Sequence, residues 1–196
     1  PPVRPGEELS PRPRRASPRA ITLQAPPEQV WPWLAQIGYQ RAGWYSYDEL
    51  EEAADVADFV DGTTSARRIV PELQALAPGD RILTHPGGGF TVDRVEPGRM
   101  LVLRTRINPR TGQTADLDQP LEGDCYAVSW AFYLDQPGPC QTRLVTRFRA
   151  DYPEVTWMKI ASPVGLEPAV FLMERKMLLG IKERVECDLL PCPEDA

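Results

Sequence analysis

The stretch Gly43-Trp44-Tyr45-Ser46-Tyr47-Asp48 gathers three aromatic rings and a carboxylate at the junction of two helix patterns. The first pattern covers Pro27–Ile37 and the second covers Tyr47–Val56. The stretch itself has no regular period, which predicts a loop that folds back on the body of the protein. Two interpretations stay open. Either core aromatics pin the loop, or the loop is a lid over an apolar cavity, the commonest kind of small-molecule site.

Length and composition limit the classes of protein to consider. A chain of 196 residues predicts about one domain with a substantial core. The 22 Lys and Arg residues are outnumbered by 28 Asp and Glu residues, so a nucleic-acid-binding surface is not expected. Apolar runs such as Met177–Ile181 are far shorter than the ~20 residues that span a bilayer. We therefore expect a protein without a membrane span, located in the cytoplasm. The sequence does not begin with Met, so an upstream signal or anchor outside it is compatible with these observations.

The four cysteines, Cys125, Cys140, Cys187 and Cys192, have neither the spacing of zinc ligands nor the density of a disulfide scaffold. A hairpin centred on Pro137-Gly138 would keep the sulfurs of Cys125 and Cys140 too far apart to bond. We therefore expect reduced thiols. One histidine and scattered thiols also argue against a metal site.

The pattern changes along the chain in a way that predicts one domain between two tails. Residues 1–18 are rich in Pro and Arg and indicate a tail or linker, because this composition cannot form a core. From Arg19 an alternating run predicts the first strand, and Pro27–Ile37 follows as a helix that ends at Gly38. We expect the domain to cover residues 19–188 and a C-terminal tail to cover 189–196.

The second half predicts antiparallel strands and one long helix. Strand-like runs separated by Gly and Pro turns are Arg81–His85, Gly89–Val95, Met100–Ile107, Cys125–Leu134 and Thr142–Asp151. Residues 166–188 carry an apolar stripe that indicates a helix. This order is an α+β plan. A helix cannot fill the whole concave face of a curved sheet, so aromatic and Met side chains are expected to line a cavity between them.

Several stretches together resemble a known superfamily. They are Arg19–Thr22, Ala25–Pro27, Val30–Leu34 with Gln36 and Gly38, Gly43–Asp48, Ile69–Gln74, Gly79–Ile82, Val95–Arg99 and Met173–Lys182. They resemble the SRPBCC superfamily of START-like helix-grip proteins, in particular a bacterial subgroup similar to polyketide cyclases and dehydratases. The resemblance implies a curved antiparallel sheet wrapped around a long C-terminal helix, with two short helices after the first strand. It implies no single reaction, because the superfamily includes lipid carriers, receptors, aromatases and cyclases.

Candidate residues for chemistry are few. No phosphate-binding Gly-rich loop or nucleophile elbow is present, so any catalysis has to be acid–base and without a cofactor. Tyr47 and Asp48 could offer a hydroxyl donor and a base, although Asp48 also suits a helix N-cap. His85 titrates near neutrality and closes a strand beside Pro86, but it could equally be a loop residue without a role.

Two glutamates have competing interpretations. Glu174 lies beside the inward stripe of the last helix, where it would need a partner or a raised pKa, as at a functional site or in a structural ion pair. Glu51 either pairs with Arg68, projects inward, or belongs to a solvated helix face.

The leading hypothesis is a protein that binds a hydrophobic, lipid- or polyketide-like molecule in an internal cavity. The residues expected to line it are Trp44, Tyr45, Phe90, Trp130, Phe132, Phe171, Met173 and Met177. The alternative is a polyketide cyclase or dehydratase that moves protons in the same cavity with Tyr47, Asp48, His85 or Glu174. A third possibility is a cavity filled by the protein's own side chains. The oligomeric state is left open.

Overall fold

A computed structural model describes residues 6, 13, 15–107, 114, 126–151 and 167–187. Its strands are β1 (Arg15–Leu23), β2 (Arg81–His85), β3 (Gly88–Glu96), β4 (Met100–Ile107), β5 (Tyr126–Gly138) and β6 (Gln141–Asp151). Its helices are α1 (Pro27–Ala35), α2 (Asp48–Ala53), the 3₁₀ turn η2 (Pro71–Leu73) and α4 (Glu167–Cys187). The α+β class is confirmed.

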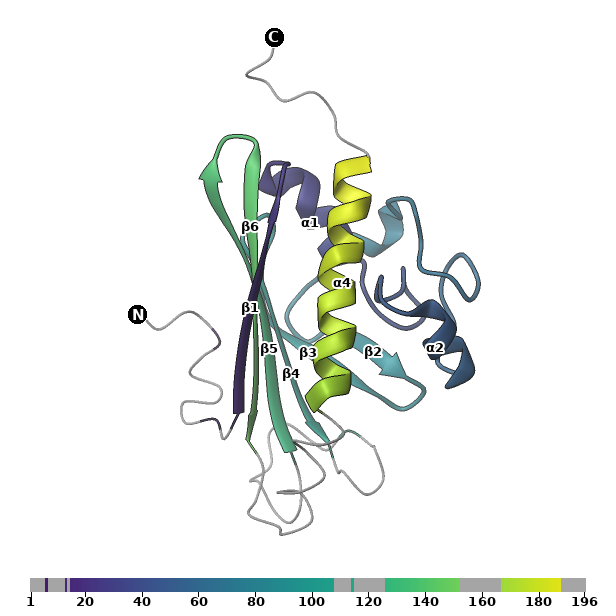
Figure 1. The fold of residues 1–196 in the computed structure, drawn as a ribbon. Coiled ribbons are helices and arrows are strands. Elements are labelled where there is room, and N and C mark those ends of the chain that lie inside the picture. Colours follow the sequence, from purple (N-terminus) through teal and green to yellow (C-terminus); the bar gives the residue numbers. More distant parts are fainter. Residues whose placement is uncertain are drawn as a thin grey trace.

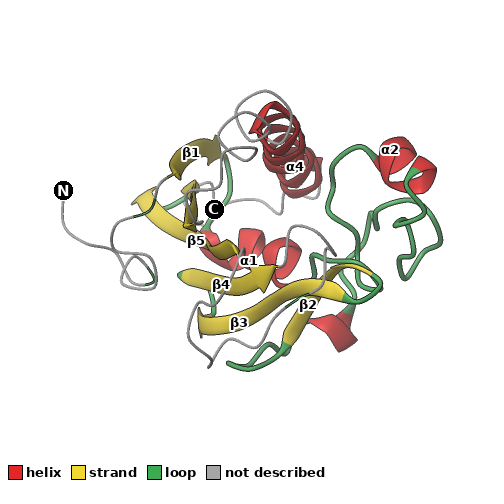
Figure 2. Ribbon diagram, turned by 90° about the horizontal axis from the view of Figure 1, so that it is seen from below, coloured by secondary structure: helices red, strands yellow, loops and turns green. Residues whose placement is uncertain are grey.

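The six strands form one antiparallel sheet in the order β1-β6-β5-β4-β3-β2. Helix α4 runs along one face of this sheet, and α1 lies near the C-terminal end of α4 (Figure 1). Viewed along the sheet, the strands curve around the space that α1 and α4 occupy, while α2 lies to one side (Figure 2). This arrangement is the expected helix-grip fold.

The core between sheet and helices forms as the sequence pattern predicts. Met177, Ile181 and Val185 of the α4 stripe are buried against strand residues such as Leu101 and Leu144. Burial of this stripe is the main apolar contribution that holds α4 on the sheet.

A second, smaller apolar cluster lies on the other face of the sheet. Met100 and Val102 of β4 alternate with core residues and pack with Ala131 and Tyr133 of β5. Gly6 is buried against Val102, where an added Cβ would lie 2.7 Å from a methyl carbon. Strand β1 also begins at Arg15, four residues before the expected start. Contacts with the sheet therefore reach into the segment expected to be a tail, and the domain limits at 19 and 188 stay a prediction.

The hairpin between β5 and β6 corrects the expectation about cysteines. Gly138 pairs with Gln141, so the turn falls on Pro139 and Cys140 instead of Pro137-Gly138, and an irregularity between Asp135 and Gly138 absorbs the difference. Cys140 is disulfide-bonded, with its partner outside the described residues, while Cys187 is free. Reduced thiols were therefore the wrong expectation at Cys140. Cys125 and Cys192 lie outside the described residues.

Within the described ranges, no helix is long and apolar enough to cross a bilayer.

We predict that Cys140 is oxidised in the isolated protein, because it is disulfide-bonded in the structure. Alkylation of free thiols followed by non-reducing peptide mapping should give a linked peptide that contains Cys140 and either Cys125 or Cys192, with Cys187 alkylated. Recovery of alkylated Cys140 as the major species would contradict the bond and support the cytoplasmic expectation.

A second prediction concerns Gly180, where α4 touches the loop after α1. Alanine normally stabilises a helix interior by ~1 kcal/mol relative to glycine. At this position a Cβ would lie 2.2 Å from the carbonyl oxygen of Tyr45. Gly180→Ala should therefore lower the free energy of unfolding by about 2 kcal/mol, measured by urea denaturation. Leu172→Ala, at a position 50% exposed on the same helix, is the control and should be nearly neutral. A stabilised Gly180→Ala variant would show that the two backbones do not touch.

Candidate functional site

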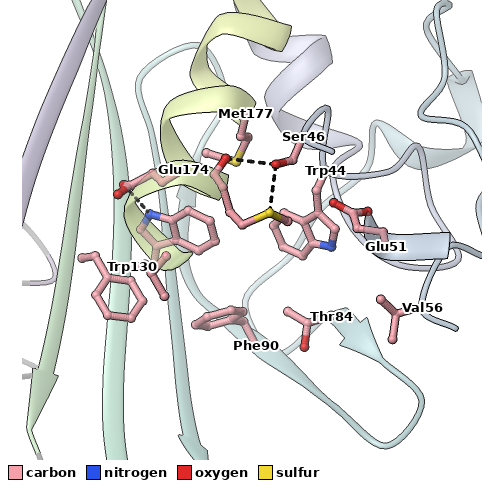
Figure 3. A pocket seen from close by; sticks show the side chains of 12 residues that line it. Trp44, Ser46, Glu51, Val56, Thr84, Phe90, Trp130, Glu174 and Met177 are labelled. Carbon is pink, nitrogen blue, oxygen red and sulfur yellow. Dashed lines mark hydrogen bonds between the residues drawn. The ribbon is translucent and has the colours of Figure 1, made fainter. Parts of the chain in front are cut away.

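A cavity of about 340 Å³ lies between the N-terminal half of α4, the sheet and the segment around α2 (Figure 3). Side chains from helices α2 and α4, from strands β2, β3, β5 and β6, and from the loops before and after α2 converge on it, so it is formed only in the folded domain. Its lining residues are Trp44, Ser46, Glu51, Val56, Thr84, Phe90, Trp130, Phe148, Val170, Met173, Glu174 and Met177.

Aromatic rings form a continuous wall of this cavity. Trp44 and Trp130 stack with their ring centroids 5.8 Å apart and their planes 15° apart. Phe90 tilts against Trp130 at 5.7 Å, and Phe148 meets Trp130 edge-on at 6.2 Å. Trp130 is thus at the centre of a set of rings that hold one another in place. The wall offers a large apolar surface of fixed shape.

The loop after α1 places Trp44 in the cavity by directing its neighbour Tyr45 the other way. The backbones of Gly38 and Gly43 exchange two hydrogen bonds of 3.1 Å, and Gly43 has a positive φ of 85°. Tyr45 also has a positive φ of 55°, which reverses the direction of successive side chains. On α4, the carbonyl oxygen of Met173 accepts a hydrogen bond of 3.1 Å from the hydroxyl of Ser46. The loop is therefore fastened on both sides of Trp44.

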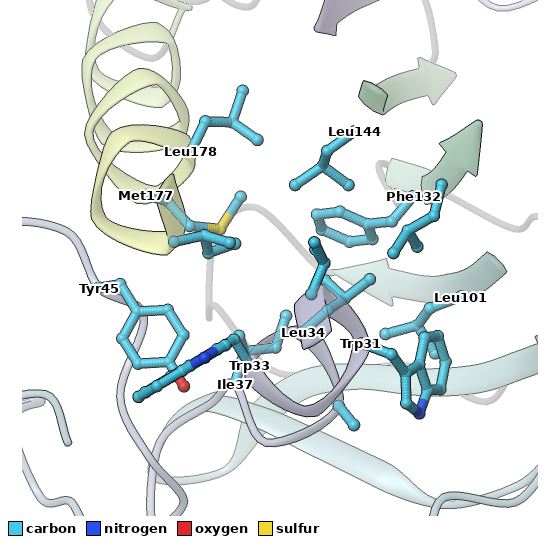
Figure 4. Packing of buried hydrophobic residues seen from close by; sticks show 14 of the residues in the cluster. Trp31, Trp33, Leu34, Ile37, Tyr45, Leu101, Phe132, Leu144, Met177 and Leu178 are labelled. Atoms are coloured by element: carbon cyan, nitrogen blue, oxygen red, sulfur yellow. The ribbon is translucent and has the colours of Figure 1, made fainter. Parts of the chain in front are cut away.

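Tyr45 was expected to line the cavity and instead belongs to the core. Its ring packs edge-on against Trp33 with centroids 6.0 Å apart (Figure 4). Its hydroxyl accepts a hydrogen bond of 2.8 Å from the side-chain amide of Gln36, and the guanidinium of Arg184 lies 4.4 Å above the ring. Burial raises the pKa of Tyr45 well above its ordinary value, although Gln36 and Arg184 oppose the increase. This phenol is a structural anchor.

Glu174 reaches the cavity from α4 and is fully satisfied by partners of this chain. Its carboxylate accepts hydrogen bonds from the hydroxyl of Thr146 at 2.6 Å and from the indole N–H of Trp130 at 3.3 Å. It also pairs with the guanidinium of Arg19 on β1, which lies next to Thr146 in the sheet. A buried carboxylate with one cation and two donors is a stable ion pair. Glu174 therefore holds Trp130 in its orientation.

Glu51 on α2 is the opposite case. Glu51 is 5% exposed, and its side chain lines the cavity. Within the described residues neither carboxylate oxygen has a hydrogen-bond partner. Burial raises the pKa of Glu51 to about 7, and the negative charge of Asp48 adds to this increase. The pairing with Arg68 that was one alternative does not form, because Arg68 contacts Asp61 at 2.8 Å. Glu51 is the carboxylate that projects inward without a partner.

Three other predicted residues lie away from the cavity. Phe132 is buried in the core beside Leu144 (Figure 4), with its ring centroid 4.8 Å from that of Trp130. Phe171 is 46% exposed, and its ring is covered by the Arg19 guanidinium at 4.7 Å. The ring of Tyr47 lies near the Lys176 ammonium at 5.9 Å and does not line the cavity. For Phe171 and Tyr47 the preceding residue, Val170 or Ser46, lines the cavity instead.

Asp48 and His85 do not line the cavity either. Asp48 begins α2 and makes no helix cap; its carboxylate accepts hydrogen bonds from the Ser65 backbone at 2.9 Å and hydroxyl at 2.6 Å. His85 ends β2 with its Nδ1 2.9 Å from the carbonyl oxygen of Pro86. Asp48 therefore fixes a loop, and Thr84, the neighbour of His85, lines the cavity instead.

The lining residues that the sequence analysis missed are Ser46, Val56, Thr84, Phe148 and Val170, together with the undecided Glu51. Strand alternation could have found Phe148, because it lies between two arginines, Arg147 and Arg149, and successive side chains of a strand point to opposite faces. The same rule applied to β2 would have chosen between Thr84 and His85. Among the described residues, no cluster of three or more His, Cys, Asp or Glu side chains could hold a metal ion.

Comparison with known proteins gives the fold and no family. No protein-family model matches the sequence, and no curated protein matches it. The structure is similar to the hypothetical protein jhp0584 from Helicobacter pylori, with a TM-score of 0.52 and 12% identity over 92% of this chain and 94% of that chain. Protein MLL2253 from Mesorhizobium loti has a TM-score of 0.45 and 16% identity over 90% of this chain and 100% of that one. CalU16 from Micromonospora echinospora has a TM-score of 0.40 and 15% identity over 88% of this chain and 85% of that one. At such identities the likeness concerns the fold alone, and the resemblance to the polyketide cyclase-like subgroup stays a prediction.

The unpaired carboxylate predicts a pH-dependent stability effect of Glu51→Gln. The pKa of Glu51 is about 7 in the native state against an ordinary 4.5, so the native protein binds this proton more tightly than the unfolded chain. Its contribution is therefore most favourable below about pH 4.5 and is lost as pH rises through about 7. Glu51→Gln should stabilise the protein at about pH 8 by on the order of 2 kcal/mol, after allowance for solvent screening, and by little at about pH 4.5.

Urea denaturation at the two pH values measures this difference. Glu52→Gln, at an exposed position next to Glu51 on α2, should show no such pH dependence. An equal effect of Glu51→Gln at both pH values would mean that Glu51 is solvated or paired.

Proposed function

We propose that this protein binds a hydrophobic small molecule in the cavity beneath the Trp44 loop. The observation that carries the proposal is the lining itself: Trp44, Phe90, Trp130 and Phe148 form a rigid aromatic wall that the chain's own side chains leave open. A volume of about 340 Å³ is near the lower end of small-molecule pockets. The ligand is therefore compact, with a body of one or two rings or a short chain.

The loop with Trp44 acts as the cover of this cavity in the proposal. Trp44 is half-buried and stacks on Trp130 across the cavity, and a hydrogen bond joins the next loop residues to α4. Because its side chain contributes to binding surface more than to the core, its removal should weaken binding more than stability. The proposal is open to a direct test on this residue.

We predict that N-phenyl-1-naphthylamine, a neutral fluorescent probe, binds with a saturable increase in emission and is displaced by 1-naphthalenemethanol. Trp44→Ala should weaken its binding by about tenfold, as expected for the loss of an aromatic contact, and should lower the melting temperature by only a few degrees. Leu50→Ala, an exposed apolar position on α2, is the control and should leave binding unchanged. Absence of saturable binding to the wild-type protein would refute the proposal.

A second candidate function, acid–base catalysis on a polyketide-like substrate, is favoured by one observation. The pKa of Glu51 is raised to about 7, close to the value that suits a proton donor or acceptor at neutral pH. Of the residues first considered for this role, Glu174 lines the cavity and is engaged by Arg19 and Thr146. Mass spectrometry after incubation with a linear poly-β-ketone separates the two functions, because a carrier returns the compound unchanged. A cytoplasmic location also stays a proposal, against which the disulfide at Cys140 weighs.

A further inference from the structure

The described residues place two buried carboxylates in the cavity, and the described part of the chain provides partners for only one of them. Glu174 has a cation and two hydrogen-bond donors from strands β1, β5 and β6. Glu51 is 5% exposed, and both of its carboxylate oxygens are buried. Neither oxygen has a hydrogen-bond partner in the described part of the chain. Figure 3 shows its carboxylate beside Trp44, at the edge of the cavity. A buried carboxylate without a partner is costly, so it indicates a place where a ligand completes the interaction.

The charged groups around Glu51 leave this place open to a cation. On its own helix, Asp48 adds negative charge and is bonded to Ser65. On α4, the Lys176 ammonium lies near the ring of Tyr47.

Two further groups are engaged elsewhere. The guanidinium of Arg184 on α4 donates to the carbonyl oxygens of Ala66 at 2.8 Å and Ser65 at 3.3 Å. On β2, the ring of His85 contacts the Pro86 carbonyl. Among the described residues no basic side chain bonds to Glu51, and the nearby acidic group is Asp48.

The rest of the lining suits the same kind of ligand. Trp44, Trp130 and Phe90 present ring faces, which attract a cation electrostatically as well as an apolar body. A ligand with a carboxylate would instead meet Glu51, with the negative charge of Asp48 nearby, and lose hydration without compensation. A neutral alcohol could donate one hydrogen bond, whereas a protonated amine can donate two or three and also neutralise the charge.

On the basis of the function proposed above, we propose that the cavity takes a compact apolar molecule with a protonated primary or secondary amine, whose N–H groups bind the carboxylate of Glu51. The aromatic wall holds the apolar body of this molecule. Glu51 is then the group that selects the ligand, and Glu174 positions Trp130 without contributing charge to recognition.

This arrangement gives the affinity a defined dependence on pH. Amine binding requires an ionised Glu51, whose pKa is about 7 in the free protein. The affinity for the amine should therefore fall as pH is lowered from about 8 to 6, by up to tenfold for each unit below the pKa. Near neutrality, amine binding should also release protons, because the bound cation lowers the pKa of Glu51.

The experiment compares three probes of one shape and different charge: 1-naphthylmethylamine, 1-naphthalenemethanol and 1-naphthoic acid. Titration calorimetry on the full chain measures each at about pH 8 and about pH 6, in buffers of different ionisation enthalpy. At about pH 8 the amine should bind at least about tenfold more tightly than the alcohol, and the acid should bind most weakly. In the Glu51→Gln variant the amine should bind no more tightly than the alcohol, and its affinity should no longer depend on pH. The affinity for the alcohol should be unchanged. Glu52→Gln should behave like wild type.

The outcomes separate this inference from the function on which it rests. If the alcohol binds saturably and the amine binds no better, or if Glu51→Gln keeps the preference for the amine, the role of Glu51 is overturned and the hydrophobic cavity stands. If the acid binds most tightly, the ligand class is overturned in favour of an anion that shares a proton with Glu51. If none of the probes and no N-phenyl-1-naphthylamine binds, both proposals are refuted.

Discussion

The contact between the backbone of α4 at Gly180 and the carbonyl of Tyr45 is the constraint on which the rest of the site depends. It is possible only because residue 180 has no Cβ, and it brings the helix onto the loop more closely than any other residue would allow. Tyr45 is at this point in a left-handed conformation, which costs a residue with a side chain roughly 1 kcal/mol or more. The ring contact with Arg184 and the hydrogen bond from Gln36 compensate for that cost. The reversal of the chain at Tyr45 is what turns Trp44 towards the cavity.

The side chain of Gln36 links Tyr45 to the rest of the loop region by hydrogen bonds. Its amide is fully buried and uses both ends: the nitrogen donates to Tyr45 and to the carbonyl of Arg68, and the oxygen accepts from the Val70 backbone and from Gln74. One side chain at the end of α1 thus connects the loop at Tyr45 with the segment from Arg68 to Gln74. A buried polar network of this kind specifies a single arrangement because every alternative leaves donors or acceptors unpaired. This network therefore holds the loop beside the aromatic wall in one position.

The helices, the strands and part of the cavity lining could be predicted from the sequence. The residues that could not be predicted have identifiable physical reasons. Gly and Pro turns delimited β2 and β4 to the residue, and the apolar stripe located α4, because these signals are local. The cavity aromatics Trp44, Phe90 and Trp130 were predictable as large apolar residues on inward faces. Tyr45 and Cys140 were not, since a positive φ and an irregular strand pair shift the side-chain direction or register at one residue. Glu51 lies in a six-residue helix, which is too short for periodicity to identify its buried face.

The two glutamates support the proposal that the cavity is a ligand site and not a packing defect. Evolution of a stable core alone would leave either an apolar residue or a compensated charge, and Glu174 shows that this fold can supply a cation and two donors to a buried carboxylate. Glu51 lies across the same cavity with its pKa raised to about 7 and with Asp48 adding to its cost. Such a residue lowers stability at neutral pH, which is the cost that the proposed ligand would offset. A ligand that supplies the missing donors turns this cost into binding free energy, because the carboxylate has already lost its water when the protein folds.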